Sequence, residues 1–185
     1  TVVEKDIGKA AELYQLAANQ GSAAARNNLG LLYENGRGVG QDKAEAARLY
    51  KQAADQGFAE AQWRLAFLYK AGATGVPQNY EEAVRYFTLA ANQGDATGQS
   101  ALGYLYECGV GVPTDMKEAV RLYKLAVAQG NAYAQNDLAR LYACGIEVEK
   151  DIDEAIRLLT LSANQGREEA KLRLKRLQKA LDAQK

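Results

Sequence analysis

The sequence predicts an all-α protein built as a stack of similar helical hairpins, and three observations support this prediction. The dipeptide Gln-Gly recurs at intervals of 36, 37, 36 and 36 residues, ending at Gly21, Gly57, Gly94, Gly130 and Gly166. Leucines, tyrosines and small residues recur between these marks at spacings of three, four and seven, as on one stripe of a helix. Glycines and helix-capping residues also recur at the same place in each unit. A fixed period of this length is typical of a repeat protein.

The repeats divide the chain, which we treat as a single solenoid domain over 1–185. The predicted segments are a partial repeat over 1–21, four full repeats over 22–57, 58–94, 95–130 and 131–166, and a C-terminal capping helix over 167–185. The partial repeat contains only the second helix of a hairpin, over about residues 6–20. Val3-Glu4-Lys5-Asp6 matches the loop that precedes the second helix of the last repeat, Val148-Glu149-Lys150-Asp151. We therefore expect the natural protein to extend further toward its N-terminus.

The first helix of each full repeat, helix A, carries a small residue, a leucine four residues later and a tyrosine four residues after that. Ala61, Leu65 and Tyr69 are the example in the second repeat. Because this spacing puts the side chains on one face, we predict that these leucines and tyrosines are core. Small residues after the leucine allow close helix approach, at Gly30, Ala66, Gly103 and Ala139. A glycine after each helix A, at Gly36, Gly72, Gly109 and Gly145, is expected to take the left-handed C-cap conformation.

The second helix, helix B, begins after a short loop at Asp42, Asn79, Asp115 or Asp151. A glutamate follows three residues later in every repeat, which predicts a reciprocal capping box. The second repeat has one extra residue near Ala73-Thr74, which should enlarge the loop between its helices. Each hairpin has two apolar faces, so stacking on the next hairpin is needed to bury them, and the result is a curved solenoid.

Composition excludes several functional classes. The 23 basic and 23 acidic residues cancel, so no global field attracts nucleic acid or an anionic membrane. No stretch of 18 apolar residues is present, so we predict no membrane insertion. The C-terminal helix is basic, with Arg167, Lys171, Arg173, Lys175, Arg176 and Lys179. A solvated end cap explains that helix more simply than nucleic-acid binding, because no groove-reading motif accompanies it.

The recurring words Asn35-Gly36-Arg37-Gly38-Val39 and Cys108-Gly109-Val110-Gly111-Val112, with the Ala-x3-Leu-Gly/Ala-x2-Tyr-x2-Gly pattern, resemble the Sel-1-like repeat family. These repeats are relatives of tetratricopeptide repeats, and the resemblance covers essentially the whole chain. It implies a right-handed α/α superhelix of antiparallel hairpins and a role as an adaptor in protein complexes. Cysteine-rich members carry a cysteine pair inside each repeat, which this chain lacks.

The chemistry of catalysis is missing from the sequence. Histidine is absent, which removes the commonest general base and the commonest metal ligand. The glycine-rich loops follow helices and lack the Lys-Ser/Thr of a phosphate-binding loop. Cys108 and Cys144 occupy the same position in successive repeats, too far apart for a disulfide, so we expect two free thiols. We predict no enzyme, no cofactor and no metal.

In tetratricopeptide-like solenoids helix A lines the concave face. With the repeat leucine as position seven of helix A, positions two, five, nine and twelve are expected to point away from the core. Trp63 and Phe67 are neighbours on this face, and Leu31 and Tyr104 occupy the place of Phe67 in adjoining repeats. The predicted partner-binding residues are Asn27, Leu31, Trp63, Phe67, Lys70, Tyr104, Tyr133, Asn136 and Arg140.

The predicted function is a scaffold that binds a partner protein or peptide in this groove, because exposed apolar patches mark interaction sites. An alternative is that Trp63 and Phe67 only pack, across the inner radius or beneath the longer loop of the second repeat. Two other functions stay open: self-association through the truncated N-terminal repeat, and binding of glycan or peptidoglycan fragments on Trp63 and Tyr104.

Overall fold

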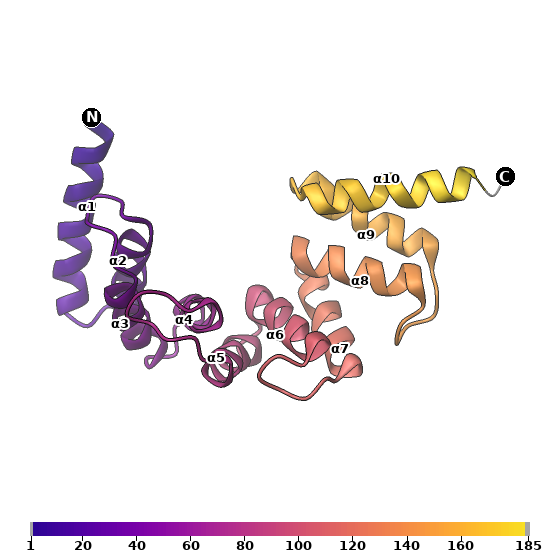
Figure 1. Cartoon of the computed structure of the whole chain (residues 1–185). Coiled ribbons are helices and arrows are strands. Elements are labelled where there is room, and N and C mark those ends of the chain that lie inside the picture. The colour runs from indigo at the N-terminus through magenta and orange to yellow at the C-terminus, as the bar shows by residue number, and fades with distance from the viewer. Residues whose placement is uncertain (1, 184–185) are drawn as a thin grey trace. The chain divides into compact units, whose positions relative to one another are not determined.

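The computed structural model describes residues 2–183, and over this range the chain forms ten helices and no strand (Figure 1). The helices are α1 (Val2–Asn19), α2 (Ala23–Asn35), α3 (Lys43–Ala54), α4 (Ala59–Ala71), α5 (Tyr80–Asn92), α6 (Ala96–Cys108), α7 (Met116–Ala128), α8 (Ala132–Cys144), α9 (Ile152–Asn164) and α10 (Glu168–Asp182). The all-α prediction is confirmed. The chain divides into two compact units, one ending at Gly98 and the other beginning at Gln99.

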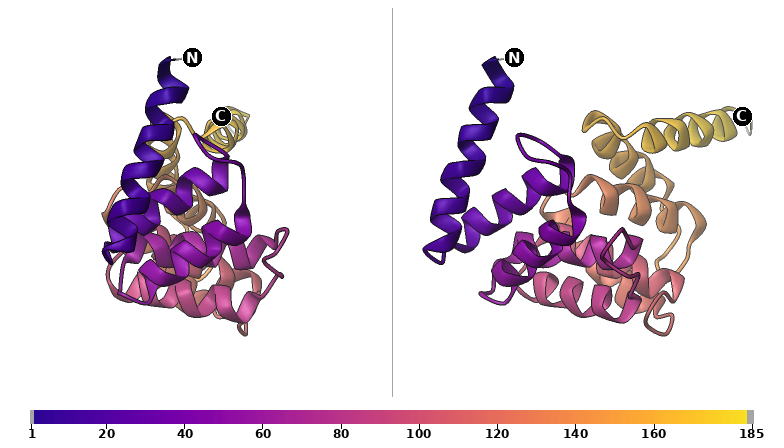
Figure 2. Two further views of the ribbon diagram at one scale, coloured as in Figure 1. Left: turned by 90° about the vertical axis from the view of Figure 1, so that its left-hand side faces the viewer. Right: turned by 60° about the vertical axis from the view of Figure 1, so that its left-hand side comes forward.

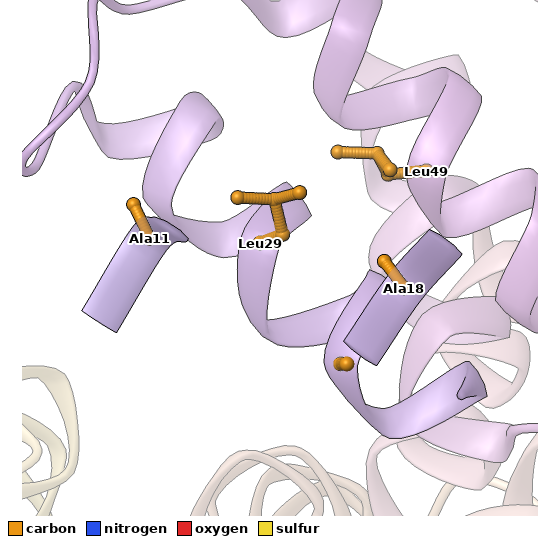
Figure 3. Packing of buried hydrophobic residues seen from close by; sticks show 5 residues of the cluster. Ala11, Ala18, Leu29 and Leu49 are labelled. Atoms are coloured by element: carbon orange, nitrogen blue, oxygen red, sulfur yellow. The ribbon is translucent and has the colours of Figure 1, made fainter. Parts of the chain in front are cut away.

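In the first unit α2 pairs with α3 and α4 with α5, each pair forming an antiparallel hairpin, and α1 packs against α2 (Figure 2). The helix α1 begins at Val2, whereas the sequence placed its start near Asp6. No glycine or proline interrupts 2–7, so the helix continues through the stretch that was expected to be a loop. The small cluster that joins these helices contains Ala11 and Ala18 of α1, Leu29 of α2 and Leu49 of α3 (Figure 3).

In the second unit α8 pairs with α9, α7 packs against α8, and α10 packs against α9. The helix α10 therefore contacts α9 through the side on which the next hairpin of a repeat array would lie. Its Ala170 is fully buried, as is Ala134 at the same place in α8. The helix α10 is thus an A-type helix in its packing as well as in its sequence pattern.

The core follows the predicted leucines but not the predicted tyrosines. Leucines at the repeat position are buried, at Leu29, Leu65, Leu102 and Leu138. The repeat tyrosines are only half-buried, at Tyr33, Tyr69, Tyr106 and Tyr142, so the prediction that they belong to the core is wrong. They lie in the last turn of helix A, next to the loop that leads to helix B of the same hairpin. The aromatic core comes instead from helix B, at Tyr50, Tyr86, Phe87 and Tyr123.

Glycine after the repeat leucine accompanies a buried tyrosine in two hairpins. A Cβ on Gly30 would lie 2.8 Å from the ring of Tyr50, so glycine is what lets α3 approach α2. The Tyr50 hydroxyl donates to Glu34 at 2.7 Å. Gly103, Tyr123 and Glu107 repeat this arrangement in the second unit, as described below.

The start of each helix B confirms one half of the capping box and corrects the other. The N-cap side chain accepts from the backbone N–H three residues on, as when Glu45 donates to Asp42 at 2.9 Å. The glutamate side chain does not return to the N-cap; Glu45 is held by Arg48 at 2.6 Å. The reason is that the Asp42 N–H already donates to the Tyr33 carbonyl. In the other three full repeats the N-cap N–H likewise donates to the carbonyl of the repeat tyrosine, and an arginine pairs with the glutamate.

The glutamine of the last three Gln-Gly words links two helices, which was not predicted from the sequence. Gln93 donates to buried Gln62 at 2.7 Å, and Gln129 donates to buried Gln99 at 2.9 Å. Gln165 donates to the equivalent residue of α8, Gln135, at 3.0 Å. The partner is always the fourth residue of helix A, about 30 residues earlier in the sequence.

Candidate partner-binding face

The first unit presents an aromatic group on its A-type helices. Trp63 and Phe67, one turn apart on α4, form an edge-to-face pair with ring centroids 6.0 Å apart. Phe67 also makes an edge-to-face contact with the buried ring of Phe87 on α5, at 4.9 Å. These contacts fix the Phe67 ring in one orientation, yet 38% of its surface is exposed. The ring thus packs within its own hairpin and remains open to a partner.

Two cations border this aromatic group. The Arg64 guanidinium lies 4.5 Å from the centre of the Trp63 ring and is paired with Glu60 at 2.8 Å. The Lys70 ammonium lies 5.9 Å from the centre of the Phe67 ring. Such placements are attractive because the face of an aromatic ring is negative. Trp63, Lys70 and the predicted neighbour Leu31 are all half-buried, so each offers part of its side chain at the surface.

Asn27 and Asn136 are not exposed, although they occupy position five of α2 and α8. Each is only 1% exposed, so the expectation that they point away from the core is wrong for both. Neighbouring side chains cover this position in the folded unit, which the helical register alone does not show. The Oδ1 atom of each accepts no hydrogen bond from the described residues. Their contact with a partner stays a prediction.

The second unit exposes two tyrosines on its A-type helices. Tyr104 on α6 is 42% exposed and Tyr133 on α8 is 57% exposed. The Arg167 guanidinium, at the start of α10, lies 3.7 Å from the centre of the Tyr133 ring. This contact brings the N-terminal ends of α8 and α10 together on one face. Cys108, one turn after Tyr104, and Cys144 are exposed free thiols.

Arg140 belongs to a polar cluster rather than standing alone. It forms an ion pair with Glu107 of α6, and Glu107 also accepts from the Tyr123 hydroxyl at 2.8 Å. Burial, followed by the charges of Asp137 and Glu107, raises the pKa of Tyr123, so its phenol stays protonated and donates. The sequence register placed Arg140 on this face but could not show that a carboxylate of α6 engages it.

Asp137 is the carboxyl group of this cluster whose ionisation the surroundings disfavour. Burial and then the neighbouring charge of Glu107 raise its pKa above the ordinary value, because both disfavour a second negative charge. The Asn136 amide, which donates to Asp137 at 3.0 Å, opposes that shift, as do Arg173 and Arg140. The second unit therefore holds two carboxylates close together, compensated by guanidinium groups from α8 and α10.

Sequence analysis missed the part of this face that α10 supplies. Counted from its repeat leucine, Leu174, positions five, nine and twelve of α10 are Leu172, Arg176 and Lys179. All three are exposed. The same register that selected Tyr133 and Arg140 could have found them, but α10 was interpreted only as a cap.

A separate shallow hollow lies between α1, α2 and the loop that follows α2. Its volume is about 560 Å³, and its lining includes Leu16 and Glu12 of α1 and Tyr33 of α2. Leu13 and Leu16 of α1 are 65% and 60% exposed. Leucines at the place of Leu13 in later helices B, such as Leu49, are buried because helix A of the same hairpin covers them.

Neither a metal centre nor a membrane span is formed by residues 2–183. No group of three or more cysteine, aspartate or glutamate side chains is arranged to hold a metal ion within that range. None of its helices combines the length and the hydrophobicity needed to cross a bilayer.

Tandem helical hairpins with an A-helix face of aromatic and charged side chains define a helical-repeat protein. The sequence model of the Sel1 repeat matches residues 1–22, 23–58, 59–95, 96–131 and 132–166. The chain therefore belongs to the Sel1 repeat family, as its motifs had indicated. Repeats of this family are generally protein–protein interaction modules, and the scaffold is typically non-enzymatic.

Solved structures of the same family agree with this fold. A Sel1 repeat protein from Oxalobacter formigenes is 33% identical, with a TM-score of 0.82 over 90% of this chain and 67% of its own. A protective antigen of uropathogenic Escherichia coli with an SLR fold is 34% identical, with a TM-score of 0.80 over 90% of this chain. This chain spans only 36% of that antigen. A comparison with characterised proteins found no significant match. The predicted helical-repeat fold class is confirmed.

Proposed function

We propose that this chain is a binding scaffold that holds a partner protein or peptide on the faces of its A-type helices. The observation that carries the proposal is the exposure of large aromatic side chains at A-helix positions that hairpin stacking does not require. Phe67, Tyr104 and Tyr133 are the residues concerned. Aromatic and arginine side chains contribute most of the energy at protein interfaces, and both occur on these faces.

A protein or peptide partner suits these rings better than a glycan does. Sugars stack on the open face of an aromatic ring. Arg64 already covers one face of Trp63, and Arg167 covers one face of Tyr133. The remaining ring edges, together with the charged groups beside them, match the mixture of apolar and polar groups on a polypeptide.

Affinity capture with variants of each unit tests the proposal. Trp63→Ala/Phe67→Ala changes the first unit, and Tyr104→Ala/Tyr133→Ala changes the second. The matched control is Leu125→Ala/Leu161→Ala, which removes comparably exposed apolar side chains from the B-type helices α7 and α9. Circular dichroism must show that all variants keep their helices, because Phe67 also supports Phe87.

The proposal predicts a partner that the unaltered chain and the leucine control both retain and that at least one aromatic variant loses. Equal retention by all four proteins would exclude the A-helix faces as the site. Loss in the leucine control alone would move the site to the B-type helices.

Self-association is a second candidate, favoured by the exposed leucines of α1. Leu13 presents a surface of the kind that helix A covers in every later hairpin, where the residue at its place is buried. Leu16 lies one turn further on, at a place that stays exposed in α5, α7 and α9. Sedimentation over a range of concentrations would show an oligomer, and Leu13→Lys/Leu16→Gln would dissociate it. Glutamine replaces Leu16 because Gln52 occupies the same place in α3. A monomer at every concentration would rule this candidate out.

A further inference from the structure

The exposed side of α10 is a positive stripe with one apolar residue at its start. Leu172 is 49% exposed, and the stripe continues one and two turns later through Lys175, Arg176 and Lys179, which are all exposed. The spacing of three, four and seven residues places these side chains on one face of the helix. The opposite face of α10 holds Ala170 and packs on α9.

The two carboxylates in the first turn of α10 do not neutralise this stripe. Glu168 pairs with Lys171 at 2.6 Å, and Glu169 pairs with Arg173 at 2.6 Å. These pairs use both acidic side chains of the first turn. Lys175, Arg176 and Lys179 form no ion pair with any described residue. Three cations within two turns therefore carry uncompensated charge into solvent.

Two further donors at the start and in the middle of α10 also lack acceptors in the described part of the chain. Arg167 Nε and Arg173 Nη1 are buried and meet no acceptor among the described residues. On the adjoining α8 the cation of this face, Arg140, is already paired with Glu107. The α10 end of the A-helix face thus carries three cations, Lys175, Arg176 and Lys179, that none of these ion pairs engages.

We infer that the α10 stripe binds an acidic segment of a partner protein, with an apolar side chain of that segment placed on Leu172. This inference rests on the proposed function, since α10 is the last A-type helix of the second unit. Charge complementarity identifies the occupant. Complementary charges steer encounter and select partners, and their effect is largest where the surface charge is unpaired. Tyr133 and Arg167 join this stripe to the aromatic part of the same face.

A random peptide library displayed on phage and panned against the full chain supplies defined probes. The enriched peptides are then synthesised and titrated against three variants. The first reverses the stripe, Lys175→Glu/Arg176→Glu/Lys179→Glu. The second is a control with the same change in net charge, Lys117→Glu/Lys124→Glu/Lys150→Glu, at exposed lysines of α7 and the loop before α9. The third is Trp63→Ala/Phe67→Ala.

The inference predicts enriched peptides with clustered aspartate or glutamate beside an apolar residue. Their affinity should fall about tenfold or more in the stripe variant and change little in the lysine control. Raising NaCl from about 50 to about 500 mM should weaken the same peptides, because salt screens exposed charges. Leu172→Ser should weaken them without altering their dependence on salt.

Several outcomes would overturn the inference. Enriched peptides without acidic bias, bound equally by the stripe variant and its control but lost in Trp63→Ala/Phe67→Ala, would contradict it and leave the proposed function standing. A library that yields no binder would contradict both. Stripe-dependent binding of single-stranded RNA or of phosphatidylserine vesicles, tighter than that of any acidic peptide, would assign the stripe to another class of partner.

Discussion

Glu147 has a backbone conformation that side chains rarely adopt. Its φ is 53°, and it is the only non-glycine residue with positive φ in the described part of the chain. Gly38 and Gly111 take the same place in the first and third repeats, with φ of 71° and 72°. A left-handed conformation costs a residue with a Cβ about 1 kcal/mol or more. The loop between α8 and α9 therefore stores strain that its counterparts avoid.

Replacing Glu147 with glycine removes about 1 kcal/mol or more of strain. Glycine also adds freedom to the unfolded chain, so the net change should lie between neutral and about 1 kcal/mol of stabilisation. Glu149→Gly is the matched control two residues later, where φ is not positive. That control should be neutral or destabilising, since glycine adds freedom to the unfolded chain. Chemical denaturation of the three proteins checks the difference, and equal stability of Glu147→Gly and Glu149→Gly would contradict the account.

The raised pKa of Asp137 makes stability depend on pH. The folded state binds this proton more tightly than the unfolded state does, so stability decreases as pH rises from the ordinary aspartate pKa through the raised one. Above that window the ionised carboxylate of Asp137 destabilises the fold at every pH.

Asp137→Asn should therefore stabilise the protein at pH 7, and its advantage should shrink as the pH is lowered toward 4. The amide oxygen can still accept from Asn136, so the hydrogen bond at this place is kept. Unfolding free energies of both proteins at the two pH values provide the measurement. A variant less stable than the parent at pH 7 would show that Arg140 and Arg173 outweigh the burial of Asp137.

At the scale of the elements, pairs of glutamines hold the helices A α4, α6 and α8 to the end of the helix B that follows each of them. Gln62 is buried, and Gln93 supplies the donor to its Oε1 atom. Its own amide donates to the Ala54 carbonyl. A buried amide left without a partner costs about 1–3 kcal/mol. The pairs therefore hold the turn after each of these helices B in place. Gln-Gly recurs there because the glutamine makes this pair and the glycine takes the conformation that the turn requires.

Gln93→Ala should destabilise the protein by about 1–3 kcal/mol, because it leaves the Oε1 atom of Gln62 unpaired. The control is Gln56→Ala. Gln56 has the same place in the first repeat, but its side chain donates to the carbonyl of Gln52 in the preceding α3 and to no buried glutamine of the described chain. That control should change stability by no more than about 0.5 kcal/mol. A similar cost for both substitutions would show that the glutamine pair contributes nothing.

Elements were predictable wherever the signal is local. Helix ends at Asp42 and Gly36 follow from capping chemistry that acts within a few residues. Contacts between helices could not be predicted in this way. The glutamate of the expected capping box turns to Arg48, because the N-cap N–H is used by the preceding helix. Half-burial of Tyr69 likewise depends on its packing against Tyr86 of the next helix.

At the scale of the molecule, the repeat period identified the family and the fold class. The candidate face was predicted less completely, because a helical register says which way a side chain points but not what lies beyond it. Phe67 and Tyr133 are exposed as that register predicts. Asn27 is buried by its neighbours, and Arg140 is engaged by a carboxylate of another helix. Both facts depend on packing across about 30 residues of sequence.

Site-specific photo-crosslinking tests the central claim, that partners lie on the A-type helices. Benzoylphenylalanine would replace Tyr133 on α8 or, as the control, Leu125 on the B-type helix α7, since both side chains are exposed. The account predicts a crosslinked partner from the position of Tyr133 and none from that of Leu125. The same partner crosslinked from Leu125 and absent at Tyr133 would contradict it and assign binding to the opposite set of helices.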